Sequence, residues 1–139
     1  MAFEQREYNG DVGTFLRGAD ALERRSLYKK IGQEELEYLR EKGYKVGDLT
    51  QAEFFGINRI NQLLGRKDCV GIRIYYGFRW EDADGNVTRE GEGELRPRLV
   101  LVGTRADGSD IFDSPVGLKG DGDGEALGDG LPCPQMCAP

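Results

Sequence analysis

The stretch Val70-Gly-Ile-Arg-Ile-Tyr-Tyr-Gly-Phe-Arg-Trp80 decides the fold. Its apolar side chains recur at every second position, and glycine, arginine or tyrosine stands between them. Because successive side chains of a strand point to opposite faces, this period of two predicts a β-strand with one apolar, covered face. The opposite face would carry Arg73, Tyr75 and Arg79.

Turn signals downstream of this strand predict a small antiparallel β-meander over residues 69–113. Asp84-Gly85 is typical of a tight hairpin. Residues 99–102 (Leu-Val-Leu-Val) are apolar on both faces and predict a central strand. Pro97 would stand at the start of that strand, where a missing N–H is tolerated. Asp107-Gly108 predicts a second reversal, with the chain returning through residues 110–112.

The residues before the meander read as helical. Apolar and small side chains recur with helical spacing from Phe15 to Ser26, and residues 33–42 are rich in strong helix formers up to Gly43. Thr50-Gln-Ala-Glu53 matches a capping box and predicts a helix that begins at Thr50 and ends at Gly65. The predicted fold class is therefore α+β, with N-terminal helices over residues 11–65 followed by the meander.

Charge and composition separate the last part of the chain from the rest. The 139 residues carry a formal charge of −6, and residues 106–139 hold seven acidic groups against one basic group. Residues 1–115 are expected to form one α+β domain. Residues 116–139 are expected to be an irregular Gly/Asp-rich tail, in which Leu131–Cys137 docks back onto the body.

The absence of histidine excludes several classes of enzyme. A chain with no His has no Ser-His-Asp triad, no Cys-His pair and no HExxH zinc helix. Glu92 and Glu94 point the same way if they lie in a strand, but the glycines beside them indicate a solvated edge and not a glycosidase pair. The sequence thus predicts a protein that is not an enzyme and has no cofactor.

The three cysteines are the weak candidates for a metal or redox site. Cys133 and Cys137 have a C-x3-C spacing, and Pro132 and Pro134 stiffen the segment. With Cys69 these two cysteines would supply three thiolates to zinc. A disulfide is a second possibility for the pair. The alternative is a buried Cys69 thiol and an exposed terminal pair without a function. The odd number of cysteines argues against a disulfide scaffold.

Two further segments carry charged patterns with ordinary explanations. Gly120-Asp-Gly-Asp-Gly-Glu125 would suit calcium, but it lacks the EF-hand pattern and is explained by a solvated acidic linker. Arg73, Tyr75 and Arg79, extended by Arg96 and Arg98, would form a basic face. The acidic overall charge argues against nucleic-acid binding there, and pairing with Glu92 or Glu94 explains the same residues.

Three segments of the chain resemble a family of small bacterial proteins of unknown function. They are Asp68-Cys-Val-Gly-Ile-Arg-Ile-Tyr75, the Leu99–Ile111 strand with its Asp-Gly turn, and the terminal segment Leu131-Pro-Cys-Pro-Gln-Met-Cys137. The match leaves residues 1–49 unassigned. The resemblance implies a cytoplasmic bacterial protein, and it implies no activity and no site residues.

These observations predict a function based on contact. The chain is expected to be a cytoplasmic, non-catalytic protein-interaction or assembly subunit of a bacterial complex, with a protein partner or self-association and no membrane insertion. No apolar run approaches the length of a membrane span, and the first residues do not form a secretory signal. Arg73, Tyr75 and Arg79 are the expected interaction residues. The alternative is a thiol-based redox or metal-binding module that uses Cys133, Cys137 and Cys69.

Overall fold

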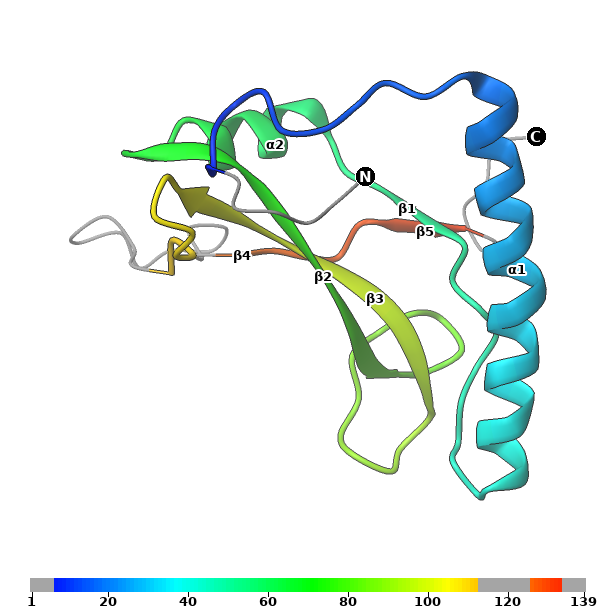
Figure 1. Cartoon of the computed structure of the whole chain (residues 1–139). Coiled ribbons are helices and arrows are strands. Elements are labelled where there is room, and N and C mark those ends of the chain that lie inside the picture. Colours follow the sequence, from blue (N-terminus) through cyan, green and yellow to red (C-terminus); the bar gives the residue numbers. More distant parts are fainter. Residues whose placement is uncertain (1–6, 113–125, 134–139) are drawn as a thin grey trace. The chain divides into compact units, whose positions relative to one another are not determined.

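The structure is a computed structural model of the chain that describes residues 7–112 and 126–133. Its helices and antiparallel strands confirm the α+β class (Figure 1). In chain order the elements are α1 (Gly18–Glu41), β1 (Ala52–Phe54), α2 (Ile57–Leu64), β2 (Cys69–Glu81), β3 (Glu94–Arg105), β4 (Ala126–Leu127) and β5 (Leu131–Cys133).

The strands form two sheets. One has the order β2-β3-β4, so the prediction that residues 99–102 lie in a central strand is confirmed. In the other, β1 pairs with β5 in antiparallel register, with Ala52 opposite Cys133. The prediction that Leu131–Cys137 docks back is therefore confirmed for residues 131–133, and residues 134–137 lie outside the described part of the chain. An irregular chain was expected over the whole tail, and this is wrong for residues 126–127 and 131–133, which form short strands.

By its internal contacts the chain divides into two compact units. The first comprises Met1–Thr14, Phe55–Tyr75 and Leu99–Asp129, and the second comprises Phe15–Phe54, Tyr76–Arg98 and Gly130–Pro139. The strands β2 and β3 each contribute residues to both units. Each unit is described by itself.

In the second unit, α1 ends in a C-terminal cap that ties it to the following loop. The Gly43 N–H donates to the Arg40 carbonyl and the Tyr44 N–H to the Leu39 carbonyl, while Gly43 has a φ of +94°. This is the Schellman arrangement, and it confirms the predicted stop at Gly43. The predicted helical stretches before it are one helix of 24 residues, which begins at Gly18 and leaves Phe15 outside.

The core of the second unit lies between α1 and the loop that follows it. Leu36, Val46 and Leu49 are buried together, and Leu39 and Leu95 pack against them. The Arg40 guanidinium donates to the carbonyls of Val46 and Gly47 at 3.2 and 3.0 Å. These bonds hold residues 46–47 against α1, where Val46 also forms a parallel bridge with Leu95 of β3.

The predicted helix start at Thr50 is wrong. The helix α2 begins at Ile57 with Gly56 as its N-cap, and residues 52–54 form β1. The Thr50 hydroxyl accepts a hydrogen bond from Arg98 Nη1 at 3.1 Å and does not cap a helix. A capping residue contributes only about 1 kcal/mol, so the strand pairing and this buried hydrogen bond outweigh the local signal. The predicted end at Gly65 is confirmed.

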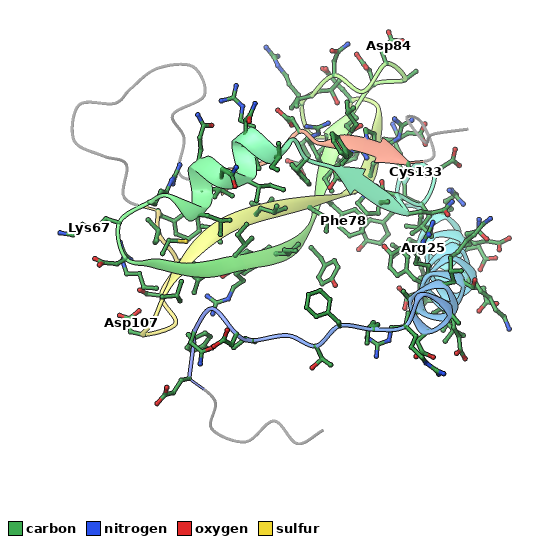
Figure 2. The ribbon with its side chains drawn as sticks, turned by 90° about the horizontal axis from the view of Figure 1, so that it is seen from above. Arg25, Lys67, Phe78, Asp84, Asp107 and Cys133 are labelled. Carbon is green, nitrogen blue, oxygen red and sulfur yellow. The ribbon has the colours of Figure 1, made fainter. Side chains whose placement is uncertain are left out.

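In the first unit, α2 packs its buried Leu63 beside β3. A Cβ at Gly103 would lie 3.1 Å from the Cys69 sulfur, 3.4 Å from the Leu63 carbonyl and 3.5 Å from the Ile111 side chain, so the packing there leaves little room for a larger residue. Residues 105–110 turn the chain back, with Gly108 at a φ of +86° and a bridge between Thr104 and Asp110. Both predicted reversals are confirmed, and Figure 2 shows Asp84 and Asp107 at their tips.

Pro97 lies inside β3 and not at its start, because the strand begins at Glu94. The Leu95 N–H donates to the Lys45 carbonyl, and the Leu95 carbonyl accepts from the Gly47 N–H. Alternate residues of a strand direct their main-chain groups to the same edge, so Pro97 shares this edge and not the one that faces β2. Its missing N–H therefore removes no bond between β2 and β3.

Candidate functional site

The two faces of β2 differ from the predicted pattern. The apolar face was expected to be covered, but Ile74, Tyr76 and Phe78 are 52%, 87% and 57% exposed. We refer to these three side chains as the β2 apolar face; Phe78 is labelled in Figure 2. The opposite face carries the charged residues, and at its second-unit end Glu81 is buried and Arg79 is half-buried. The prediction of a covered apolar face is therefore wrong over residues 74–78.

The buried charges in the second unit form a cluster around Glu81, which has no exposed surface. Arg98 binds both carboxylate oxygens, with Nε–Oε2 and Nη2–Oε1 distances of 2.5 and 2.7 Å. Arg79 Nε donates to Oε2 at 3.0 Å, and Arg96 Nη1 lies 3.7 Å from Oε1. We call Glu81 with these three arginines and Thr50 the Glu81 cluster.

The arginines keep Glu81 ionised. Burial alone would raise the pKa of the Glu81 carboxyl, because a charge is poorly solvated inside a protein. The hydrogen bonds and positive charges of Arg98 and Arg79 outweigh this effect, so that pKa lies below its usual value. At neutral pH Glu81 therefore holds no proton and is a poor proton acceptor.

Two glycines give the Glu81 cluster the room it needs. A Cβ at Gly47 would lie 2.6 Å from Arg96 Nε, a buried atom for which the described residues supply no hydrogen-bond partner. Gly93 has a φ of +84°, and a Cβ there would lie 2.1 Å from the Glu81 carbonyl oxygen. Larger residues at either position would displace the main chain or the arginine.

A second polar cluster, in the first unit, is centred on Asp110. Arg73 Nη1 donates to Asp110 Oδ1 at 2.6 Å and to the Gly108 carbonyl at 2.9 Å. The Tyr75 hydroxyl donates to Asp110 Oδ2, and Thr104 donates to Oδ1 at 3.4 Å. The Tyr8 ring lies over the Arg73 guanidinium at 5.5 Å. This Asp110 cluster fastens the 105–110 turn to β2.

The pKa values in the Asp110 cluster move in the directions that these bonds require. The hydrogen bond from Tyr75 is the largest cause that holds the pKa of Asp110 below its usual value. Burial opposes it, and the hydrogen bond and charge of Arg73 add to the lowering. The same bond to a carboxylate raises the pKa of the Tyr75 hydroxyl. Asp110 is thus an anion and Tyr75 a neutral phenol at neutral pH.

The structure places the predicted interaction residues in different units. Arg73 and Tyr75 meet at Asp110, whereas Arg79 binds Glu81. Arg96 and Arg98 share the face of Arg79, as expected, but they are 9% and 8% exposed and pair with Glu81. The prediction that Glu92 or Glu94 pairs with these arginines is therefore wrong.

Sequence reasoning missed Glu81 and Asp110 as the centres of the two clusters. The signal for Glu81 was present, since it lies two residues after Arg79 and a strand places both on one face. The sequence gives no such signal for Asp110, since its position indicates only that the chain returns there after the second turn.

The cysteines differ in state. Cys69 is a half-buried free thiol that donates to the Gly71 carbonyl at 3.2 Å, whereas Cys133 is disulfide-bonded. Cys137 lies outside the described residues, as does the acidic segment 120–125. Within residues 7–112 and 126–133, no group of three or more His, Cys, Asp or Glu side chains is placed to hold a metal ion.

None of the helices in the described part of the chain combines the length and the apolar character needed to cross a membrane. Comparison of the chain with family models, with curated proteins and with solved structures gave no match.

Proposed function

We propose that this chain is a non-catalytic protein-interaction or assembly subunit of a bacterial complex and that it works in the cytoplasm. The observation that carries the proposal is the β2 apolar face. An alternating apolar strand is typical of a buried sheet face, yet Ile74, Tyr76 and Phe78 are more than half exposed in the isolated chain. A partner protein that covers them would supply the missing half of the core.

The size of these side chains makes their burial by a partner favourable. An aromatic side chain buries about 150–250 Å² when it is covered, and apolar area contributes about 25 cal/mol per Å². Tyr76 at 87% exposure therefore offers a gain of several kcal/mol to a partner that buries it. Aromatic anchors of this kind commonly dominate the binding energy of protein interfaces.

The state of the polar clusters supports a binding role. Glu81 and Asp110 each bind arginine, and the pKa of each carboxyl lies below its usual value. General acid–base catalysis near neutral pH favours a group whose pKa lies near the working pH. Each cluster instead fastens its own part of β2 to neighbouring segments of the same unit.

Affinity capture from the native cell tests the proposal. The tagged chain should retain a stoichiometric protein, and the double substitution Tyr76→Lys and Phe78→Lys should release it. Tyr44→Lys is the matched control, since Tyr44 is 57% exposed and lies outside β2. Equal recovery with all three chains, or saturable turnover of a metabolite by the isolated chain, would contradict the proposal.

The disulfide at Cys133 favours a second candidate function, a thiol-based redox module that uses Cys133 and Cys137. In this case, thiol titration of the unfolded, unreduced protein should detect one thiol, from Cys69, and three after reduction. The redox function also requires that a cellular dithiol reductant opens the bond rapidly. Three reactive thiols before reduction, or a bond that resists such a reductant, would eliminate this candidate.

A further inference from the structure

We propose that the partner of β2 is a second copy of this chain, paired antiparallel along the outer edge of β2 about a two-fold axis at Tyr75. This inference rests on the proposed function, because it identifies the protein that the assembly subunit binds. It joins two β2-β3-β4 sheets into one continuous sheet across the dimer.

The outer edge of β2 is the edge that faces away from β3. At the end of β2, the Trp80 carbonyl accepts from the Thr88 N–H and the Asp82 N–H donates to the Asn86 carbonyl, each at 3.0 Å. The Glu81 carbonyl instead faces Gly93, which directly precedes β3. Because main-chain groups alternate between the two edges of a strand, even-numbered residues of β2 direct theirs away from β3.

Among the described residues, nothing pairs with the outer edge over residues 71–79. The sheet order places β2 at the end of its sheet, and residues 86–88 cover the edge only beside residues 80–82. An open edge of this length is a template for another strand.

The sequence of the open stretch favours pairing with itself. Residues 71–79 have their midpoint at Tyr75, so a two-fold axis there uses the whole open edge. Ile74 then lies opposite Tyr76 of the second copy, and Ile72 lies opposite Phe78. Arg73 faces Gly77, so no like charges meet. Moving the axis to Tyr76 would place Arg73 opposite Arg79, and facing charges of one sign destabilise a strand pair.

Pairing about this axis also brings the β2 apolar faces of the two copies side by side. Ile74 and Tyr76 become cross-strand neighbours on one face of the joined sheet, and cross-strand pairs of aromatic and β-branched side chains stabilise a sheet. Main-chain hydrogen bonds along the two edges supply the rest of the interface.

Light scattering after size exclusion tests the dimer and its register. The wild-type chain should have twice the chain mass of 15.5 kDa. Ile74→Lys and Tyr76→Glu should each weaken dimerisation at least about tenfold. An equimolar mixture of the two variants should recover the dimer, because the axis at Tyr75 brings the introduced lysine and glutamate together. Tyr44→Glu is the control and should remain dimeric.

The outcomes separate this inference from the proposed function. A wild-type chain that is monomeric at its highest soluble concentration overturns the dimer, and so does a dimer that survives both single substitutions. In either case the proposed function stands if the chain captures a different protein and the substitutions at Tyr76 and Phe78 release it. Failure of the mixture to recover the dimer overturns the axis at Tyr75.

Discussion

Replacing Arg98 with methionine tests whether the Glu81 cluster is as important for the fold as its geometry indicates. Methionine keeps much of the stem of the side chain and removes the guanidinium. The substitution deletes two hydrogen bonds to the buried Glu81 carboxylate and one to Thr50. Glu81 then keeps only the 3.0 Å bond from Arg79 and the more distant Arg96.

The magnitude follows from these contacts. Hydrogen bonds to charged groups contribute about 1.5–3 kcal/mol each, and removing one partner of a buried ion pair costs about 3–5 kcal/mol. Because two arginines remain, the expected loss is at the lower end, about 3 kcal/mol. With about 2.1 cal/mol/K of unfolding entropy for each of 139 residues, the midpoint of thermal unfolding should fall by about 10 °C.

Urea unfolding and a thermal scan measure this loss. The matched control is Arg25→Met, since Arg25 is an exposed residue of α1 that is labelled in Figure 2. Exposed substitutions of this kind usually change the free energy of unfolding by less than about 0.5 kcal/mol. If Arg98→Met is no more destabilising than Arg25→Met, the Glu81 cluster does not stabilise the fold and the reasoning is refuted.

Three further predictions concern pH and glycine. The pKa values of Glu81 and Asp110 in the folded chain lie below the unfolded values of about 4.3 and 3.9. The unfolded chain therefore binds more protons at these two carboxyls as the pH drops. The free energy of unfolding should fall as the pH drops from about 5 towards the folded pKa values. Urea unfolding at pH 7 and pH 3 checks this, and the double variant Glu81→Gln and Asp110→Asn should flatten the dependence; an unchanged slope would contradict it. Gly93→Ala should cost at least about 3 kcal/mol, because the methyl group meets the Glu81 carbonyl, whereas Gly91→Ala, with the same positive φ and open space, should cost about 1 kcal/mol. Equal losses would show that the contact is unimportant. Gly47→Ala should destabilise the chain through its contact with Arg96 alone, and thermal unfolding no different from the wild type would contradict the close packing.

The sequence predicted the elements whose signals are local. The alternation from Val70 to Trp80, the glycine at position 43 and the two Asp-Gly turns each act through the conformation of a few neighbouring residues, and each matches the structure. Thr50 shows the limit of such signals. Its capping box is genuine as a pattern, but the hydroxyl binds Arg98, which is distant in the sequence.

The candidate site was harder to predict, because periodicity does not say which face of a strand is covered. The alternation of β2 divides apolar from charged side chains correctly. Whether the charged face is buried depends on Glu81 meeting Arg96 and Arg98 of β3, and this compensation lowers the cost of burying them. Sequence reasoning assigned the arginines to solvent because it took Glu92 and Glu94 as their partners.

Amide hydrogen exchange along β2 tests most directly whether a second copy of the chain covers its outer edge in the assembled form. In the dilute, isolated chain the N–H groups of Ile74, Tyr76 and Phe78 should exchange quickly, while those of Tyr75 and Gly77, which face β3, should exchange slowly. In the assembled form all five should exchange slowly. Fast exchange at Ile74, Tyr76 and Phe78 in the assembled form, equal to that in the isolated chain, would contradict strand pairing along this edge.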